Sequence, residues 1–271
     1  MKDKIDIEVQ LVVDAIYQGY GYDFREYKPA TIKNRLEGIK NEYGYNHISD
    51  LIPKIIHDRS FFESLYLAMS VTVTEMFRDP KVYIKFRELI MPTLKTYPFV
   101  NIWHAGCATG EEVYSMAILL KEAGMLHRSQ LYATDINNHS LAIAEKGIYS
   151  IEEMKSNIEN YNKIKGSGEM GDYYHARYKG AKMDESLKER ITFSIHNLAT
   201  DWVFAETQLI VCRNVLIYFN NQLKERVIQL FADSLCHHGY LCLGSHESLD
   251  FSKAKAQFEI VDKDAKIYRK I

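Results

Sequence analysis

Cysteine is scarce in this chain. Its 271 residues include four cysteines, at positions 107, 212, 236 and 242, and no two of them form a Cys-x-x-Cys pair. We therefore expect reduced, mostly buried thiols in a cytoplasmic protein. Histidines are scattered as well, and the group His237, His238 and His246 lacks the spacing of metal ligands, so no metal is expected.

Net charge and long apolar runs are also lacking. Lys plus Arg number 34 against 36 Asp plus Glu, a formal net charge of −2, so no global field attracts nucleic acid or membrane. No apolar run approaches the roughly 20 residues of a membrane-spanning helix. The N-terminal stretch MKDKIDIEVQ has no apolar signal-peptide core. We expect a cytoplasmic monomer that neither binds nucleic acid nor inserts into a membrane.

Hydrophobic periodicity divides the chain into a helical part and an alternating part. Ile32, Leu36, Ile39 and Tyr43 follow the i, i+4, i+7, i+11 spacing of one helix face. From Phe99 onward, short apolar runs alternate with longer helical patterns: FVNIWHA, QLYATDI, RITFSIHN and QLIVCRNV. This rhythm predicts a mostly parallel sheet covered by helices on both faces. We predict a helical domain over 1–78, a linker over 79–98 and an α/β domain over 99–271.

One segment of the α/β part breaks this rhythm. Residues 151–188 are polar, rich in tyrosine and punctuated by glycine, as in KGSGEMGDYYHARYKG. They match neither a core helix nor a core strand, so we predict a small inserted β-subdomain. The final stretch, FEIVDKDAKIYRKI, predicts an antiparallel hairpin at the edge of the sheet.

A loop of small residues, HAGCATGEEVYS (104–115), joins the first apolar run to a helical pattern. Such a strand-to-helix turn lets a ligand approach the backbone and directs helix N–H groups at it. Gly106, Ala108 and Gly110 form GxAxG, which is neither the dinucleotide pattern nor a phosphate loop. The loop brings no positive side chain, so it suits a nucleoside with an amino-acid tail, whose ammonium one of the two following glutamates would face. Turn chemistry and the helix dipole are the alternative explanation.

Asp135 ends the next apolar run, in YATDI. An acid at the tip of the second strand, beside a glycine loop after the first, can accept hydrogen bonds from both ribose hydroxyls. A helix-capping role is the simpler alternative. Together the two features favour a nucleoside without phosphates, and hence S-adenosylmethionine.

Several longer motifs now resemble one family. They are VTVTEMFRDP (71–80), WHAGCATGEEVYSMAILL (103–120), YATDINNHSLAIAEKGIYS (132–150), HNL (196–198), IVCRNVLIYFN (210–220) and GYLCLGSHESL (239–249). The chain resembles the CheR family of chemotaxis receptor methyltransferases, which transfer a methyl group from S-adenosylmethionine to receptor glutamates and release S-adenosylhomocysteine. The resemblance implies a Rossmann-like methyltransferase domain with an N-terminal helical domain and a small inserted β-subdomain.

The resemblance also implies roles for particular residues. The cofactor would contact Thr72, Thr74, Arg78, Gly106, Gly110, Glu112, Asp135, Asn197, Leu198, Arg213 and Asn214. Glu112 would meet the methionine end, and Arg78 and Tyr218 would act in methyl transfer. Two positions depart from the family pattern: Thr72 stands where many members have asparagine, and Val113 where many have proline. Thr72 can still form a hydrogen bond, but its side chain has a shorter reach than asparagine.

A glutamate acceptor needs no general base, because its pKa of about 4.3 leaves it ionised at neutral pH. Catalysis would come from holding the acceptor oxygen, methyl carbon and sulfur in line and from excluding water. Arg78 can hold a carboxylate by a bidentate fork, either the substrate's or the cofactor's. The alternatives are a surface ion pair for Arg78 and a core aromatic for Tyr218.

Substrate docking is expected on a basic stretch. The stretch from Phe24 to Lys40 contains five basic residues and two acidic ones. Lys28, Lys33, Arg35 and Lys40 resemble the basic helix with which the family docks on the helical cytoplasmic domain of chemoreceptors; an ordinary solvated helix face is the alternative. Whether the inserted subdomain binds a receptor C-terminal peptide by strand addition stays open.

Two other functions are alternatives to receptor methylation. The first is a catalytically silent module that binds the cofactor or scaffolds receptors, against which the intact set of site residues argues. The second is methylation of a small molecule or nucleic acid, which the low charge and the absence of an NPPY-like motif disfavour.

Overall fold

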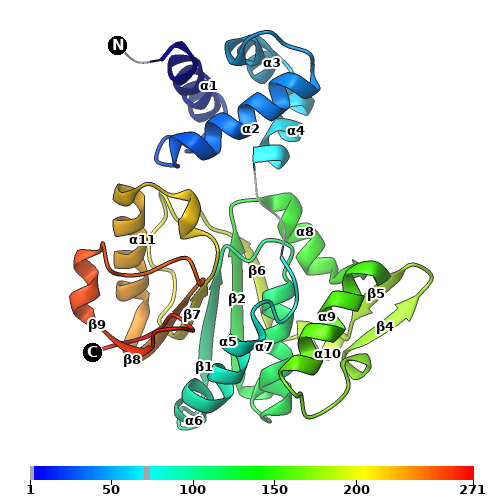
Figure 1. Cartoon of the computed structure of the whole chain (residues 1–271). Helices are drawn as coiled ribbons and strands as arrows, with labels where there is room; N and C mark the ends of the chain where they lie inside the picture. The colour runs from blue at the N-terminus through cyan, green and yellow to red at the C-terminus, as the bar shows by residue number, and fades with distance from the viewer. Residues whose placement is uncertain (1–2, 70–73) are drawn as a thin grey trace. The chain divides into compact units, whose positions relative to one another are not determined.

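The chain forms two units of unequal size. The computed structural model describes residues 3–69 and 74–271 (Figure 1). A helical unit comprises 1–71 together with 217–226, and a larger unit comprises 72–216 and 227–271. The N-terminal unit therefore includes a segment from late in the chain, which no sequence pattern indicated.

Helices with apolar stripes build the helical unit. They are α1 (Lys4–Tyr20), α2 (Pro29–Glu42), the 3₁₀ turn η1 (Ile48–Asp50), α3 (Leu51–His57), α4 (Arg59–Met69) and the start of α11 (Asn221–Ser234). Three of the four residues predicted on the buried face of α2, Ile32, Leu36 and Ile39, are buried. The fourth, Tyr43, follows the end of the helix and is exposed. Pro29 occupies the first turn, where its missing N–H costs no helix hydrogen bond.

A seven-stranded sheet forms the centre of the larger unit, in the order β6-β2-β1-β7-β8-β10-β9. The strands are β1 (Val100–Ala105), β2 (Ser129–Asp135), β6 (Ile191–Ile195), β7 (Thr207–Cys212), β8 (Leu235–Leu243), β9 (Phe258–Asp262) and β10 (Ile267–Lys270). Strands β6, β2, β1, β7 and β8 pair in parallel. The predicted terminal hairpin is confirmed, with β10 antiparallel to both β8 and β9.

Strand order reverses direction between β1 and β7. From β1 the chain order runs outward through β2 to β6, and from β7 it runs the other way to β8. In open α/β sheets ligands bind beyond the carboxyl ends of the strands at such a switch point. The segments that follow β1, β2 and β7 are therefore the place to look for a site.

The stretch predicted as a linker, 79–98, is folded and belongs to the larger unit. It forms α5 (Pro80–Lys85), a π-helical turn η2 (Phe86–Ile90) and α6 (Met91–Leu94). Tyr83, Phe86 and Ile90 are fully or almost fully buried in the core of this unit. The linker prediction is wrong because these apolar residues already repeat at helical spacing, in pieces too short to stand out.

Further helices of the larger unit follow the sheet strands. They are α7 (Glu111–Glu122), η3 (Leu126–Arg128), α8 (Asn138–Lys146), the end of α11, and η6 (Lys253–Gln257). Helices α7 and α8 both pack against β2. The turn η5 (Leu216–Tyr218) lies where the chain passes from the larger unit to the helical one.

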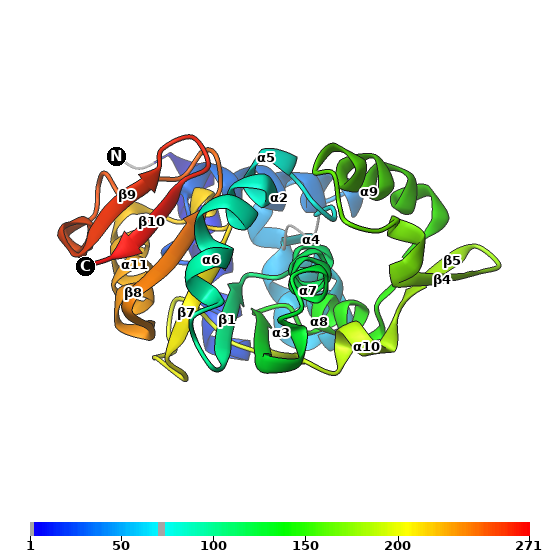
Figure 2. The same ribbon diagram turned by 90° about the horizontal axis from the view of Figure 1, so that it is seen from below.

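The inserted subdomain is present, but it contains more than strands. A separate antiparallel sheet, β3-β5-β4, is made by β3 (Ile148–Ser150), β5 (Gly180–Met183) and β4 (Tyr174–Arg177). Figure 2 shows the β4–β5 hairpin and the β9–β10 hairpin at opposite ends of the larger unit. The short η4 (Met170–Tyr173) and α10 (Glu185–Lys188) flank the strands.

A full helix between β3 and β4 contradicts the expectation that 151–188 holds no core helix. Helix α9 (Ile151–Lys163) begins at a capping box formed by Ser150 and Glu153. Met154, Asn157 and Tyr161, spaced three and four apart, are buried on one face. The helix was not predicted because most residues of this segment are polar and only a narrow stripe is buried.

Glu122, the last residue of α7, ties the subdomain to the rest of the larger unit. Its buried carboxylate accepts hydrogen bonds from Arg87 at 2.7 Å, from the Tyr161 hydroxyl at 2.5 Å and from the Ser167 N–H at 3.1 Å. Charge-assisted hydrogen bonds of this kind are the strong ones. One carboxylate thus joins η2, α7 and the loop after α9.

Within the described residues no helix has the length and hydropathy that crossing a bilayer requires. Residues 3–69 and 74–271 also contain no group of three or more His, Cys, Asp or Glu side chains that could hold a metal ion. All four cysteines are free thiols, and three of them are buried.

Candidate functional site

The glycine loop lies where the sequence predicted it, between β1 and α7. Gly106 and Gly110 have φ of +76° and +94°, the left-handed region that favours glycine. A Cβ on Gly106 would stand 2.5 Å from a methyl carbon of Val215, and one on Gly110 would stand 2.7 Å from the Cβ of Ala144. Backbone conformation and close packing therefore both demand glycine at the two positions.

Asp135 ends β2 and holds the loop directly. One of its oxygens accepts the Ala108 N–H at 2.8 Å, and the other accepts the Asn137 N–H at 2.8 Å. Burial raises the pKa of Asp135, and these backbone hydrogen bonds oppose the rise. The predicted proximity of the acid and the loop is present in the structure.

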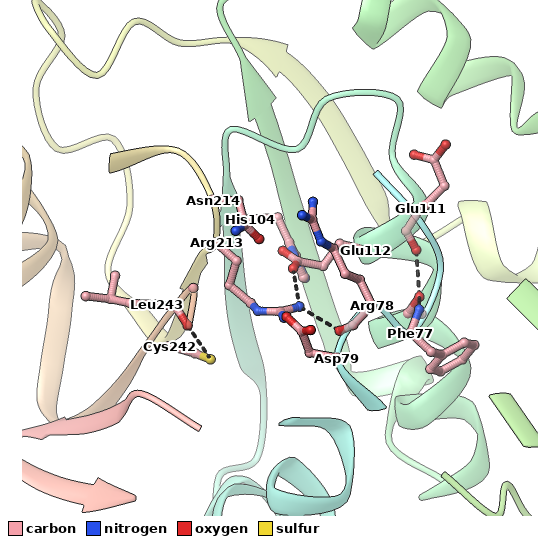
Figure 3. A network of polar contacts seen from close by, with 12 residues as sticks. Phe77, Arg78, Asp79, His104, Glu111, Glu112, Arg213, Asn214, Cys242 and Leu243 are labelled. Atoms are coloured by element: carbon pink, nitrogen blue, oxygen red, sulfur yellow. Dashed lines mark hydrogen bonds and ion pairs between the residues drawn. The ribbon is translucent and has the colours of Figure 1, made fainter. Parts of the chain in front are cut away.

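A buried ionic network lies beside the loop (Figure 3). The Arg213 guanidinium, 2% exposed, donates to Glu112 at 3.1 Å, to the carbonyl oxygen of Arg78 at 3.1 Å and to Asp79 at 2.6 Å. The other oxygen of Glu112 lies 3.2 Å from Nδ1 of His104. Residues from β1, α7, the end of β7 and the segment before α5 are thus joined at one point.

The network keeps Glu112 ionised in spite of its burial. Burial alone would raise the pKa of Glu112, but hydrogen bonding to His104 and the charge of Arg213 outweigh it and lower the pKa. An ionised, partly buried carboxylate at the start of a helix can bind an ammonium group. Arg213, which the resemblance placed among cofactor contacts, donates from its two terminal nitrogens to Glu112, Asp79 and the Arg78 carbonyl oxygen.

His104 was missed by the sequence interpretation. Its ring is fully buried and contacts Glu112 from β1. The one available signal was a polar residue inside the apolar run FVNIWHA. A buried polar side chain needs a partner, and here the partner is the predicted cofactor residue.

The segment before α5 carries two of the predicted residues, Thr74 and Arg78, both half-buried. Backbone hydrogen bonds fix it to the larger unit: the Met76 N–H donates to Asn157 Oδ1 and the Phe77 N–H to Ser115 Oγ, each at 2.9 Å. Thr72, predicted to contact the cofactor, lies outside the described residues.

Asn197 and Leu198 follow β6, the strand next to β2. Leu198 is buried, and Asn197 shapes the turn by accepting the Ala199 N–H at 2.9 Å. The adjacent His196 N–H donates to the carbonyl oxygen of Asp135 at 3.2 Å. This turn therefore meets the end of β2, and the roles of Asn197 and Leu198 near the adenine stay predictions.

Tyr218 belongs to the helical unit. Its carbonyl oxygen accepts the Lys28 N–H at 2.8 Å, and the Arg35 guanidinium lies 5.9 Å from its ring centroid. The catalytic role predicted for Tyr218 stays a prediction, since its described partners are in the helical unit and the network partners are in the larger one.

The four predicted docking residues differ in how far they are free to act. Lys28 is exposed and Lys40 half-buried, while Lys33 lies 3.7–3.8 Å from Asp3 and Asp6. Arg35 donates to the carbonyl oxygens of Ala68 and Met69 at the end of α4. Arg35 therefore stabilises the helical unit, whatever it does in docking.

Glu111 differs from its neighbour Glu112. Figure 3 shows its side chain directed away from Glu112 and Arg213. The carboxyl group is buried, with Thr109 Oγ1 2.9 and 2.7 Å from its two oxygens. Burial raises the pKa of Glu111 to about 7, although the hydrogen bond from Thr109 acts to lower it.

The raised pKa of Glu111 predicts that the protein becomes less stable as pH rises. Because the folded-state pKa exceeds the ordinary value, the contribution of Glu111 to the free energy of unfolding falls as pH rises from about 4.5 to about 7. The Glu111→Gln variant should therefore have a free energy of unfolding about 1–3 kcal/mol higher than wild type at pH 8 and equal to wild type at pH 4.5. Urea unfolding followed by tryptophan fluorescence at several pH values measures this. Glu152→Gln, at an exposed site on α9, is the control, and equal pH slopes in both variants would refute the prediction.

Comparison with known proteins gives two adjoining family matches. The model described as "CheR methyltransferase, SAM binding domain" matches residues 72–267, and that described as "CheR methyltransferase, all-alpha domain" matches residues 7–70. A Pseudomonas putida protein named as a methyltransferase, Cher3, is 49% identical over 265 residues, covering 98% of this chain and 97% of that protein.

More distant relatives carry a more specific name. The "Chemotaxis protein methyltransferase" of Borreliella burgdorferi is 29% identical over 262 residues, 91% of this chain and 89% of that protein. The protein of the same name from Listeria innocua is 27% identical over 231 residues, 84% and 85% of the two chains.

Proposed function

Since the chain belongs to the CheR methyltransferase family, we propose that it methylates glutamate side chains on the cytoplasmic helical domain of chemoreceptors and so adjusts adaptation in chemotaxis. S-adenosylmethionine is the methyl donor, because the matched domain is the SAM-binding domain of that family. The proposal includes a cytoplasmic location and a monomeric state. One arrangement carries it: two carboxylates, Glu112 and Asp135, flank the same glycine loop.

The residues of the loop fit the cofactor. Gly106 and Gly110 allow the tight turn of the loop against Val215 and Ala144, and the loop carries no cation that would call for a phosphate. Asp135 would accept the ribose hydroxyls, Glu112 would face the ammonium, and Asn197 and Leu198 would lie near the adenine. Thr74, Arg78 and Asn214 would complete the contacts.

Bound S-adenosylmethionine supplies an electrophilic methyl group on a sulfonium. A glutamate acceptor is ionised at neutral pH, so the protein has no proton to remove from it. The tasks left to the chain are to orient the acceptor carboxylate and to keep water out. Arg78 has the fork geometry for the first task, and Tyr218 is the second candidate for it.

Two observations support a receptor glutamate as acceptor. Several relatives are named chemotaxis protein methyltransferases. Lys28 is exposed and Lys40 half-buried on the basic stretch, so both can contribute to the attraction of acidic receptor helices.

The test combines binding with turnover. Calorimetric titration with S-adenosylmethionine and S-adenosylhomocysteine measures the cofactor site. Transfer of a radiolabelled methyl group to a receptor cytoplasmic fragment, released as methanol by base, measures ester formation. Labelled ester on wild-type receptor, absent when its candidate glutamates are replaced by alanine, supports the proposal. Cofactor binding without ester on any receptor would favour the silent module, and no binding by the folded chain would contradict the enzyme.

A further inference from the structure

Glu247 is a buried carboxylate between the ends of two neighbouring strands, β7 and β8. It is 5% exposed. One of its oxygens accepts the Gly244 N–H at 2.6 Å, just after β8, and the Asn214 N–H at 3.1 Å, just after β7. Burying a carboxylate is costly unless hydrogen bonds replace water, so these two backbone donors offset part of that cost.

Asn214 has an unusual backbone conformation. Its φ of +61° lies in the left-handed region, which asparagine adopts more readily than most other non-glycine residues. The hydrogen bond to Glu247 holds its N–H in this conformation. The fit is tight, because a Cβ on Gly244 would stand 2.8 Å from both the Asn214 nitrogen and the Glu247 oxygen.

The residues on either side of Asn214 both reach the site. Arg213, before it, is the centre of the buried network with Glu112 and Asp79 (Figure 3). Val215, after it, packs where a Cβ of Gly106 would be, under the glycine loop. A shift of the Asn214 peptide would therefore move the support of Glu112 and the support of the loop together.

We propose that Glu247 is a positioning residue for the methyl-transfer site. It acts through the backbone of Asn214 and thereby sets the place of the Arg213 guanidinium and of the Val215 side chain. This inference rests on the cofactor site of the proposed function. It gives a role to Glu247, a residue to which the family resemblance assigned none.

The reach of the side chain, rather than its charge, is what this role requires. Glu247→Gln keeps an oxygen at the same distance from both N–H groups, whereas Glu247→Asp keeps the charge and is one methylene shorter. We expect Glu247→Gln to bind S-adenosylhomocysteine within about threefold of wild type. Glu247→Asp and Glu247→Ala should bind at least about tenfold more weakly, a loss of about 1.4 kcal/mol.

Calorimetric titration with S-adenosylhomocysteine measures the affinities, and amide hydrogen exchange of Asn214 and Gly244 follows the two hydrogen bonds. Exchange at Asn214 should accelerate in Glu247→Asp and stay close to wild type in Glu247→Gln. Glu259→Ala, half-exposed on β9, is the control. Should Glu247→Ala fail to fold, the comparison of Gln with Asp decides alone.

Tighter binding by the Asp variant than by the Gln variant would overturn the proposal, because charge would then be what matters. Wild-type affinity in both would overturn it as well. Receptor methylation by wild type is measured in the same series. If wild type binds cofactor but forms no ester, the receptor function fails while the affinities still decide the role of Glu247.

Discussion

The Arg213→Met variant is expected to lose about 3–5 kcal/mol of the free energy of unfolding of the larger unit. The replacement keeps most of the buried volume but removes the donors to Glu112, Asp79 and the carbonyl oxygen of Arg78. Glu112 would then be a buried charge facing only His104 in this network. Urea unfolding followed by fluorescence measures the loss, since both tryptophans, Trp103 and Trp202, belong to the larger unit.

A second substitution separates charge from packing. Adding Glu112→Gln to Arg213→Met removes the uncompensated charge, so the double variant should recover part of the lost stability. Arg177→Met, on the exposed strand β4, is the matched control and should change the free energy by no more than about 0.5 kcal/mol. A single variant as stable as this control would mean that the network contributes nothing to folding.

Asp135→Ala is expected to weaken binding of S-adenosylmethionine by at least tenfold. The substitution removes the acceptor proposed for the ribose hydroxyls and also frees the Ala108 N–H, which the carboxylate now holds at 2.8 Å. Each hydrogen bond to a charged group contributes about 1.5–3 kcal/mol, and 1.4 kcal/mol corresponds to a factor of ten in affinity. Calorimetric titration of the folded variant measures the change.

Two further variants serve as an intermediate case and as a control. Asp135→Asn keeps one acceptor oxygen and should fall between wild type and alanine. Asp264→Ala, in the exposed turn between β9 and β10, should bind like wild type. An Asp135→Ala variant that binds the cofactor normally would move the nucleoside away from the end of β2.

Short-range patterns predicted much of this architecture. The buried face of α2, the glycine loop and Asp135 all depend on residues close in sequence, whose spacing is set by helix and strand geometry. The reversal of strand order between β1 and β7 then brings the segments after β1, β2 and β7 to one edge of the sheet.

Features that depend on distant partners were not predictable in this way. Glu122 joins Arg87, Tyr161 and Ser167, which are far from it in the sequence. Glu247 lies in the motif GYLCLGSHESL, but its role depends on the neighbouring ends of β7 and β8. The helices of 80–94 escaped notice since a π-helical turn and Pro92 divide them into pieces of four to six residues.

The discontinuous helical unit has a consequence for folding during synthesis. Residues 217–226 complete it: the Tyr218 carbonyl accepts the Lys28 N–H, and Asn220 bonds Glu26 through both backbone and side chain. A ribosome adding about 5–20 residues per second delivers this segment roughly 7–30 s after residue 71. The first domain to emerge is therefore completed only after residues 72–216 of the larger unit have been made, and until then it is only partly assembled.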